Sequence, residues 1–261
     1  MKYILRTICA SFIIHMKQSF SRPTFRFVII LQPLFYSLLL YFMYNRSELS
    51  DIGERIIIGT GIMNLWSSMI YSSASDIERE RYMGTLETIY TVPSDFRIIY
   101  LGKVLGNIAL GLFSVVISIV CVTGLLGFRV TIGQPLLFIS SAIVTILSFI
   151  IISLLLALLF TLSRNSRVFM NCLEYPVFIL CGVVFPVTLL PKGLQWFSYI
   201  LSPTWSTDLL KESMSGNLSY PDFIWKLSVF SLLNVIYLAL MVLFYKNFNS
   251  LIREKGTLGV H

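Results

Sequence analysis

Few residues in this sequence of 261 have the types and spacing that catalysis requires. The two histidines, His15 and His261, supply little acid–base chemistry, and neither a His-Glu-x-x-His nor a Gly-x-Ser-x-Gly run occurs. At the position where a phosphate-binding loop requires glycine before Gly102-Lys103, the chain has Arg97. The four cysteines lie in apolar stretches without metal-ligand spacing, which is typical of small buried hydrophobic residues. We therefore expect no catalytic residue, cofactor-binding residue or metal ligand on this chain.

The densest group of charged residues is the segment 75–97, SDIERERYMGTLETIYTVPSDFR. Ser75 and Glu78 have the spacing of a capping box, which predicts that a helical turn begins there. Gly84 then interrupts the helix, the next residue can cap a second short helix, and Pro93 predicts its end. The segment is either a solvated loop whose charges pair locally, or a rigid plug that docks into a groove of a partner protein.

Several polar side chains lie within long apolar stretches. Packing between helices explains such residues, and so does the lining of a transport path. The path hypothesis concerns five residues: Asn64, Ser67, Ser68, Asn107 and Glu174. Glu174 differs from the others because a charged carboxylate at the membrane centre costs about 2.5–3.5 kcal/mol. We interpret it either as a pathway or gating residue or as an interfacial structural residue.

The composition explains why so few charges are available. The chain is 56% hydrophobic and 13% charged, with a mean hydropathy of +0.80, whereas an ordinary globular chain is about 45–50% apolar and roughly 25% charged. So few charges cannot cover a water-soluble body of this length, so lipid must replace the missing polar surface. The net charge of +7 does not indicate nucleic-acid binding, because the basic residues are dispersed and form no dense patch.

Apolar helices of about 20 residues cross the hydrocarbon layer of a membrane. The sequence contains six such stretches, at residues 25–44, 56–74, 98–126, 136–162, 168–187 and 223–245. We therefore predict an all-α integral membrane protein with six transmembrane helices, which form a single transmembrane domain over residues 1–261.

The distribution of basic residues predicts the orientation, because short loops rich in Lys and Arg stay in the cytoplasm. With both termini inside, six of the 20 Lys and Arg residues fall outside: Arg46, Arg55, Arg129, Lys192, Lys211 and Lys226. The other 14 fall inside. We expect a multi-pass protein of a cell membrane, such as a bacterial inner or plasma membrane, with both termini cytoplasmic.

Residues 1–20 form the pattern of an amphipathic helix and lack a clear cleavage site for a signal peptidase. Ile4, Ile8 and Phe12 gather on one side of this helix and basic residues on the other, which predicts a helix on the inner membrane surface. It serves either as an anchor or as a platform for a cytoplasmic partner. We expect His15 to be an interfacial polar residue.

The segment between the fifth and sixth spans is too polar for another crossing and too apolar for a freely solvated loop. We predict that residues 189–215 form an external re-entrant segment, which either anchors the chain at the interface or acts as an external gate. The candidate gate residues are Pro186, Pro191, Phe197, Pro203 and Trp205.

Two sequence runs are similar to a known family. GTLETIYTVPSDFRIIYLGKVLGN, preceded by IERERYMG, resembles the cytoplasmic loop of type-2 ATP-binding-cassette transporter permeases. FPVTLLPKGLQWFSYILSPTWSTDLLKESMSG resembles the external segment of the same family between spans five and six, although Lys192-Gly193 departs from the bulkier start expected there. Together with the six-span layout, the resemblance covers nearly the whole chain.

The resemblance implies a cytoplasmic coupling helix between spans two and three that docks into an ATPase subunit. The residues concerned are Glu78, Arg79, Glu80, Arg81, Gly84, Thr85, Leu86, Glu87 and Pro93. It also implies that ATP and Mg²⁺ bind to that separate subunit, and that two permeases, alike or merely similar, complete the transporter.

The predicted function is therefore an exporter permease without enzymatic activity of its own. The apolar spans favour a drug, a hydrophobic or amphipathic peptide, or a lipid-like molecule as cargo. Two alternatives remain open: an intramembrane enzyme acting on a lipid-linked substrate, and an ATP-independent channel or immunity protein.

Overall fold

The computed structural model describes residues 2–45, 51–85, 95–162, 166–216 and 218–255, and the regular elements among them are all helical. The longer helices are α1 (Lys2–Phe20), α2 (Pro23–Tyr44), α3 (Ile52–Tyr82), α5 (Phe96–Val120), α6 (Pro135–Leu162), α7 (Ser166–Leu180) and α10 (Tyr220–Lys255). The shorter ones are the π-helical turn η1 (Cys121–Leu125), the 3₁₀ turn η2 (Val187–Leu189), α8 (Lys192–Ile200) and α9 (Ser202–Ser215).

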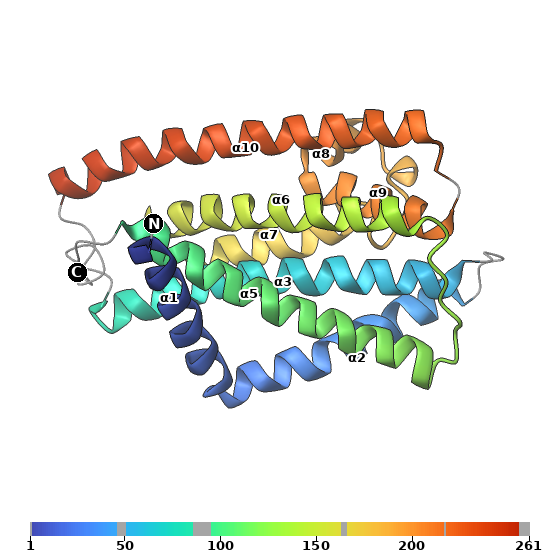
Figure 1. Ribbon diagram of the computed structural model, residues 1–261, viewed down its shortest axis with the longest axis horizontal. Helices are drawn as coiled ribbons and strands as arrows, with labels where there is room; N and C mark the ends of the chain where they lie inside the picture. Colours follow the sequence, from blue (N-terminus) through green and yellow to red (C-terminus); the bar gives the residue numbers. More distant parts are fainter. Residues whose placement is uncertain (1, 46–50, 86–94, 163–165, 217, 256–261) are drawn as a thin grey trace.

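Helix α3 is the centre of the bundle, and α2, α5, α6, α7 and α9 all pack against it (Figure 1). Residues 56–70 are buried with the exception of Ser68, which is partly exposed. Because protein rather than lipid surrounds α3, it can carry Thr60, Asn64 and Ser67 in its middle, where each finds a hydrogen-bond partner.

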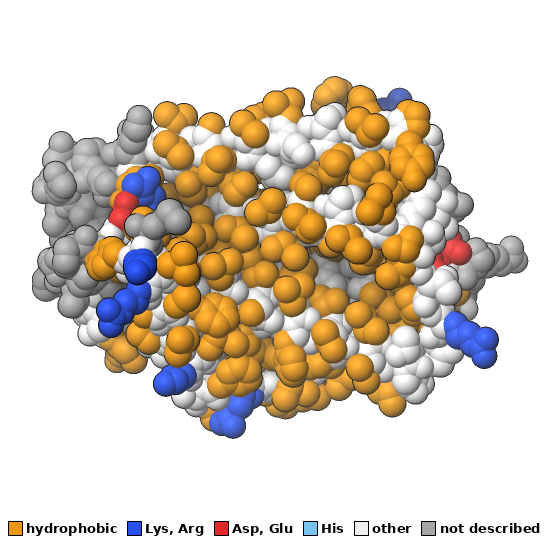
Figure 2. All heavy atoms as spheres, in the orientation of Figure 1, with side chains coloured by type: hydrophobic (Ala, Val, Ile, Leu, Met, Phe, Trp, Pro, Cys, Tyr) orange, Lys and Arg blue, Asp and Glu red, His pale blue; other side chains and the backbone are white. Residues whose placement is uncertain are grey.

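Four helical segments are long and apolar enough to cross a membrane: Phe25–Tyr44, Phe96–Leu125, Pro135–Thr161 and Tyr220–Tyr245. They correspond to the first, third, fourth and sixth predicted spans. Figure 2 shows that apolar side chains cover the middle of the visible face, while charged side chains lie toward its margins. This distribution is that of a multi-pass membrane protein.

The second and fifth predicted spans are not among these four segments, and the helices at their positions have different ends. Helix α3 contains residues 56–74 but continues without a break to Tyr82, so the predicted helix start at Ser75 is wrong. The helix extends further because charged residues of its last turns contact side chains of other helices: Asp76 contacts His15 of α1, and Glu80 forms an ion pair with Lys103 of α5. Helix α7 ends at Leu180, earlier than the predicted 187, since Gly182 turns the chain with φ +69°.

Helix α1 packs against α5 as well as presenting exposed apolar residues. Two glycines of α5 allow this contact: a Cβ atom on Gly102 would lie 2.6 Å from the carbonyl oxygen of Ile8, and one on Gly106 would lie 2.7 Å from His15 Cδ2. The predicted helix is therefore present. His15 is 1% exposed, which corrects the expectation of an interfacial position.

The opposite end of the molecule from α1 carries α8 and α9 (Figure 1). Helix α9 is largely buried and packs against α3, α6 and α10, whereas α8 exposes most of its apolar side chains. The backbone N–H groups of Gly133 and Gln134 donate to the carbonyls of Met214 and Ser213 and so satisfy the C-terminal end of α9.

Candidate functional site

A group of ionisable residues, some buried and some partly buried, lies where α1, α3 and α5 meet, at the end of the molecule that carries α1. We call it the α1-end cluster; its members are His15, Arg22, Asp76, Arg79, Glu80 and Lys103. Helix α3 contributes three of them at i, i+3 and i+4, a spacing that places side chains on one face of a helix.

Asp76 is the acidic centre of this cluster. Its Oδ2 lies 3.1 Å from His15 Nδ1, and its Oδ1 accepts a hydrogen bond of 3.2 Å from Arg22 Nη2 and lies 3.9 Å from Arg79 Nη2. Burial alone would raise the pKa of the Asp76 carboxyl. The hydrogen bond from His15 and the nearby positive charges, including Lys103, outweigh burial and hold that pKa well below its usual range.

Further contacts tie the end of α3 to its neighbours. Glu80 forms an ion pair with Lys103 of α5 and accepts a hydrogen bond from Tyr100. Arg79 donates to Gln18 of α1 at 2.5 Å, and Arg81 donates to the Thr161 carbonyl of α6 at 2.6 Å. The last two turns of α3 are therefore bonded to three different helices.

His15 links the cluster to polar residues within the apolar helices α3 and α5. Its Nε2 lies 2.5 Å from Asn107 Oδ1, while the Asn107 carbonyl accepts a hydrogen bond of 2.9 Å from Ser68. Both ring nitrogens thus face oxygen acceptors. An imidazolium can donate to both, whereas a neutral tautomer can donate to only one.

A groove with a volume of about 440 Å³ opens beside α2, and we call it the lateral groove. Apolar residues of α2 dominate its lining, with polar side chains from α2, α3 and α5 among them. The lining residues are Arg22, Phe25, Phe27, Val28, Ile29, Leu31, Gln32, Phe35, Asn64, Ser67, Ser68 and Ser114. A site of this size and character suits a small, mostly apolar molecule.

The five candidate path residues are close together. Asn64, Ser67 and Ser68 line the lateral groove. Glu174 is fully buried and accepts a hydrogen bond of 2.6 Å from Ser67, and Asn107 is 2% exposed and bonded to Ser68. The last two residues therefore support the groove from inside the bundle.

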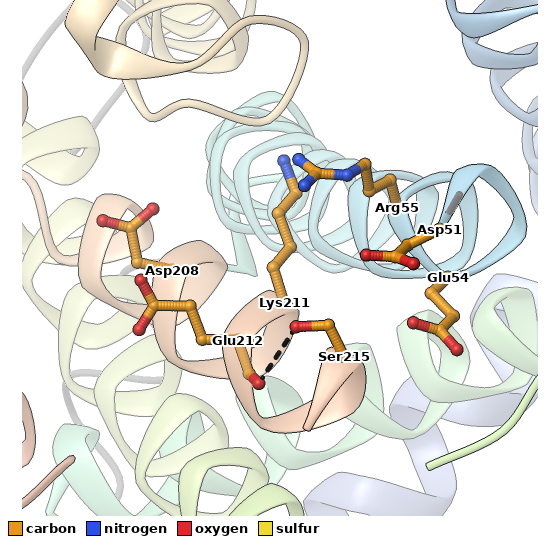
Figure 3. Close-up of a pocket in the computed structure, with 7 residues that line it drawn as sticks. All are labelled: Asp51, Glu54, Arg55, Asp208, Lys211, Glu212 and Ser215. Carbon is orange, nitrogen blue, oxygen red and sulfur yellow. Dashed lines mark hydrogen bonds between the residues drawn. The ribbon is translucent and has the colours of Figure 1, made fainter. Parts of the chain in front are cut away.

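A second cavity lies at the opposite end, between the start of α3 and α9. Its volume is about 170 Å³, and charges of both signs line it: Asp51, Glu54, Arg55, Asp208, Lys211, Glu212 and Ser215. Figure 3 shows the Arg55 and Lys211 side chains near one another, with acidic residues on either side. Burial raises the pKa of the Asp208 carboxyl. Burial lowers that of Lys211 to about 8, although Asp208 opposes the change.

Lys211 also holds the turn that follows α7. Its Nζ donates to the Gly182 carbonyl at 2.8 Å and to the Val183 carbonyl at 3.3 Å. The Tyr44 hydroxyl, at the end of α2, donates to the carbonyls of Val183 and Val184 at 3.2 and 2.8 Å. We call these contacts the turn clamp, because two helices fix one short backbone segment.

The predicted coupling residues are described only in part. Glu78, Arg79, Glu80 and Arg81 belong to α3. The helix ends at Tyr82 and Gly84 has φ +68°, in agreement with the predicted interruption. The Thr85 hydroxyl donates to the Glu80 carbonyl at 3.3 Å. Leu86, Glu87 and Pro93 lie outside the described residues.

The candidate gate residues do not form one group. Pro203 and Trp205 are buried in α9, where the Trp205 indole donates to the Tyr199 carbonyl at 2.9 Å and its ring contacts Trp225. Phe197 is 63% exposed on α8. Pro186 precedes η2 and Pro191 precedes α8, so both prolines mark turns.

Sequence reasoning did not identify His15, Asp76 or Lys103 as site residues, although two signals were present. His15 lies on the apolar side of the amphipathic helix, only about 20° from Ile4 at 100° per residue. Lys103 lies within an apolar span, where an ionisable residue needs a partner. Among the described residues, no three His, Cys, Asp or Glu side chains gather to hold a metal ion.

Comparison with known families agrees with this architecture. A family model described as ABC-2 type transporter matches residues 6–214, which is most of the chain. No curated protein matches the sequence. The chain therefore belongs to the ABC-2 type transporter family and is a membrane permease domain of that family.

Proposed function

We propose that this permease is the membrane subunit of an ATP-driven exporter, with both termini in the cytoplasm and ATP hydrolysis on a separate subunit. Two copies, or this chain and a similar permease, would form the complete path. The observation that carries the proposal is the set of buried contacts that bind the end of α3 to α1, α5 and α6.

These contacts explain how a distant ATPase could act on the membrane helices. The loop at residues 84–93, which follows α3 directly, is the proposed docking element. A force on this loop reaches Asp76, Glu80 and Arg81 within two turns of helix, and each of them is bonded to a different helix. A rigid, multiply bonded helix end transmits displacement better than a solvated loop.

The lateral groove supports a role in cargo passage. Polar Asn64, Ser67 and Ser68 face a space whose walls along α2 are mostly apolar, and Ser67 donates a hydrogen bond to Glu174 behind it. This arrangement suits a hydrophobic or amphipathic cargo, and includes the drug, peptide and lipid-like classes. The turn clamp and the α8–α9 corner would form the external gate of the same path.

The proposal is tested by purifying the permease with its ATPase and reconstituting both in vesicles. We expect stable capture of an ATPase subunit, and transport that stops when the lysine of that subunit's phosphate-binding loop is replaced. Transport or catalysis by the purified chain alone would contradict the proposal and favour a channel or an intramembrane enzyme.

Gly84→Pro tests the coupling loop within the same assay. Proline fixes φ near −65° and cannot adopt the +68° that Gly84 has. We expect ATP hydrolysis to continue while transport per ATP falls. Gly127→Pro is the matched control: Gly127 has φ +73° in the turn after η1, at the other end of α5 from the loop. Equal coupling in both variants would refute the role of the loop.

A further inference from the structure

The lateral groove has a charged end and an apolar length. Arg22 lies at one end, and the lining residues of α2 continue to Phe35. The 13 residue steps from Arg22 to Phe35 correspond to about 20 Å of helix at 1.5 Å per residue. The hydrocarbon core of a membrane is about 30 Å thick, so the groove is long enough to reach from one membrane surface past the middle.

The guanidinium of Arg22 is only partly neutralised by its own chain. It donates one hydrogen bond to Asp76, but that carboxylate also serves His15 and Arg79. The Arg22 side chain is 30% exposed and the Asp76 side chain 4% exposed, so the cation faces the groove and the anion lies behind it. A guanidinium has five N–H donors, and one is bonded to Asp76. The end of the groove therefore favours an anion.

The middle of the groove offers an acceptor. The hydroxyls of Ser67, Ser68 and Ser114 donate to Glu174, to the Asn107 carbonyl and to the Ile29 carbonyl respectively. Since each hydroxyl proton is directed into the chain, these serines offer no donor to a ligand; Ser67 and Ser114 are also 1% and 5% exposed, whereas the partly exposed Ser68 can accept. Around them, Val28, Leu31 and Phe35 give the groove apolar walls.

We propose that the lateral groove binds an amphiphile that has an acidic head group and one hydrocarbon chain. The head group pairs with Arg22 at the membrane surface, and the chain lies along α2 toward Phe35. This inference rests on the proposed function and narrows its cargo to anionic lipid-like molecules. Under the proposed orientation, such molecules enter from the inner leaflet.

A second copy of the chain is the competing occupant, because Phe27 and Phe35, which line the groove, are 61% and 62% exposed. An apolar partner helix would not need a cation at the end of the groove, whereas an acidic head group does. The charge at Arg22 therefore favours the amphiphile, and the experiment includes the second copy as an outcome.

The test measures equilibrium binding to the permease alone in nanodiscs of zwitterionic lipid. The probes are a pyrene-labelled long-chain fatty acid and the alcohol and amine of the same chain, at a pH at which the acid is ionised. We expect the acid to bind about tenfold more tightly than the alcohol, as one charge-assisted hydrogen bond predicts, and the amine to bind least well. Equal affinities for acid and amine would overturn the proposal.

Three variants assign the effect to the groove. Arg22→Gln should lower affinity for the acid about tenfold and leave the alcohol unchanged, because only the charge-assisted bond is lost. Arg22→Lys, which keeps the charge and its contact with Asp76, should retain the preference for acid. Arg26→Gln is the matched control, since Arg26 is one turn further along α2, exposed, and does not line the groove. Loss of the preference in Arg26→Gln but not in Arg22→Gln would refute the assignment.

The second copy is tested through Phe27→Cys. A disulfide between two copies that abolishes binding of the acid would show that another permease fills the groove, and would overturn the proposal. Because binding is measured without the ATPase, it fails or succeeds independently of ATP-driven transport. A permease that transports with ATP but binds no acidic amphiphile would refute this inference alone.

Discussion

The contacts of Asp76 show why a buried carboxylate in this protein is charged. One carboxylate meets the ring of His15 and the guanidinium of Arg22, with a second guanidinium from Arg79 nearby. A buried charge is stable only when paired and hydrogen-bonded, and removing one partner leaves the others without compensation. The stability of the α1-end cluster therefore depends strongly on this single residue.

We predict that Asp76→Asn lowers the free energy of unfolding by about 3 kcal/mol at neutral pH, because it removes the buried carboxylate that His15 and the partly buried guanidiniums of Arg22 and Arg79 contact. Asp95→Asn is the control. Asp95 pairs with Arg97 near the surface, where such a pair contributes under about 1 kcal/mol, and asparagine is equally suited to its N-cap position. Denaturant unfolding in detergent measures both variants.

The effect of Asp76 should also depend on pH in one direction. The pKa of Asp76 is lower in the folded protein than its ordinary value of 3.8. Its contribution to the free energy of unfolding is therefore complete above pH 3.8, and it is lost as the pH falls through the lower pKa of the folded protein. The difference between wild type and Asp76→Asn should shrink as pH falls below about 4, where the carboxyl of the unfolded chain becomes protonated. A difference that grows on acidification would contradict the ion-pair explanation.

At the scale of helices, the sequence predicts best those elements that lipid surrounds. The stretches 25–44, 98–126, 136–162 and 223–245 correspond closely to segments apolar enough to cross a membrane, because a helix that contacts lipid must be apolar. Residues 56–70 of α3 are largely buried among other helices, and the polar residues that this position allows make the helix less apolar. Its continuation to Tyr82 could not be predicted, because it depends on partners such as His15 and Lys103 that are distant in sequence.

The candidate site shows the same limit. Asn64, Ser67 and Glu174 could be recognised in the sequence because they are polar residues within apolar stretches. In the structure, Ser67 donates a hydrogen bond to Glu174. The expectation for His15 was wrong because a single amphipathic helix does not reveal which neighbour covers it. The notch formed by Gly102 and Gly106 on α5 provides that cover.

The turn clamp leads to a prediction about the end of the molecule that carries α9. Tyr44→Phe combined with Lys211→Met removes the side-chain donors that hold the carbonyls of residues 182–184. Loss of these bonds should raise the population of locally open states at least tenfold, since each contributes about 1 kcal/mol or more. The buried thiol of Cys181 should then react faster with a maleimide, in a background where the exposed Cys9 and Cys172 are serine.

Tyr245→Phe is the control for the clamp. The Tyr245 hydroxyl donates a hydrogen bond of 3.0 Å to Asp95, at the opposite end of the bundle from the clamp. The substitution therefore removes a comparable tyrosine hydrogen bond. Labelling of Cys181 should not change in this variant. If Tyr245→Phe accelerates labelling as much as the double variant does, the turn opens through general loosening of the bundle and the clamp has no specific role.

At the scale of the whole molecule, the two polar ends of the bundle differ in chemistry. The end that carries α1 has the charged helix end of α3 and the loop that follows it, while the end that carries α8 and α9 has the mixed-charge cavity (Figures 1 and 3). The apolar belt between them sets how the molecule lies in a membrane (Figure 2). The apolar belt does not show which end of the bundle faces the cytoplasm. The distribution of Lys and Arg predicts that orientation.

Single cysteines at the two ends test this orientation. Tyr82, 85% exposed at the end of α3, and Gly193, which has open space around it on α8, both accept a cysteine without a clash. In the background without exposed native thiols, a membrane-impermeant maleimide should label Gly193→Cys on intact cells and Tyr82→Cys only after permeabilisation. The reverse result would put the end of α3 outside, where no cytoplasmic ATPase could reach it. Coupling through the loop after α3 would then be physically excluded, whatever the family of the chain.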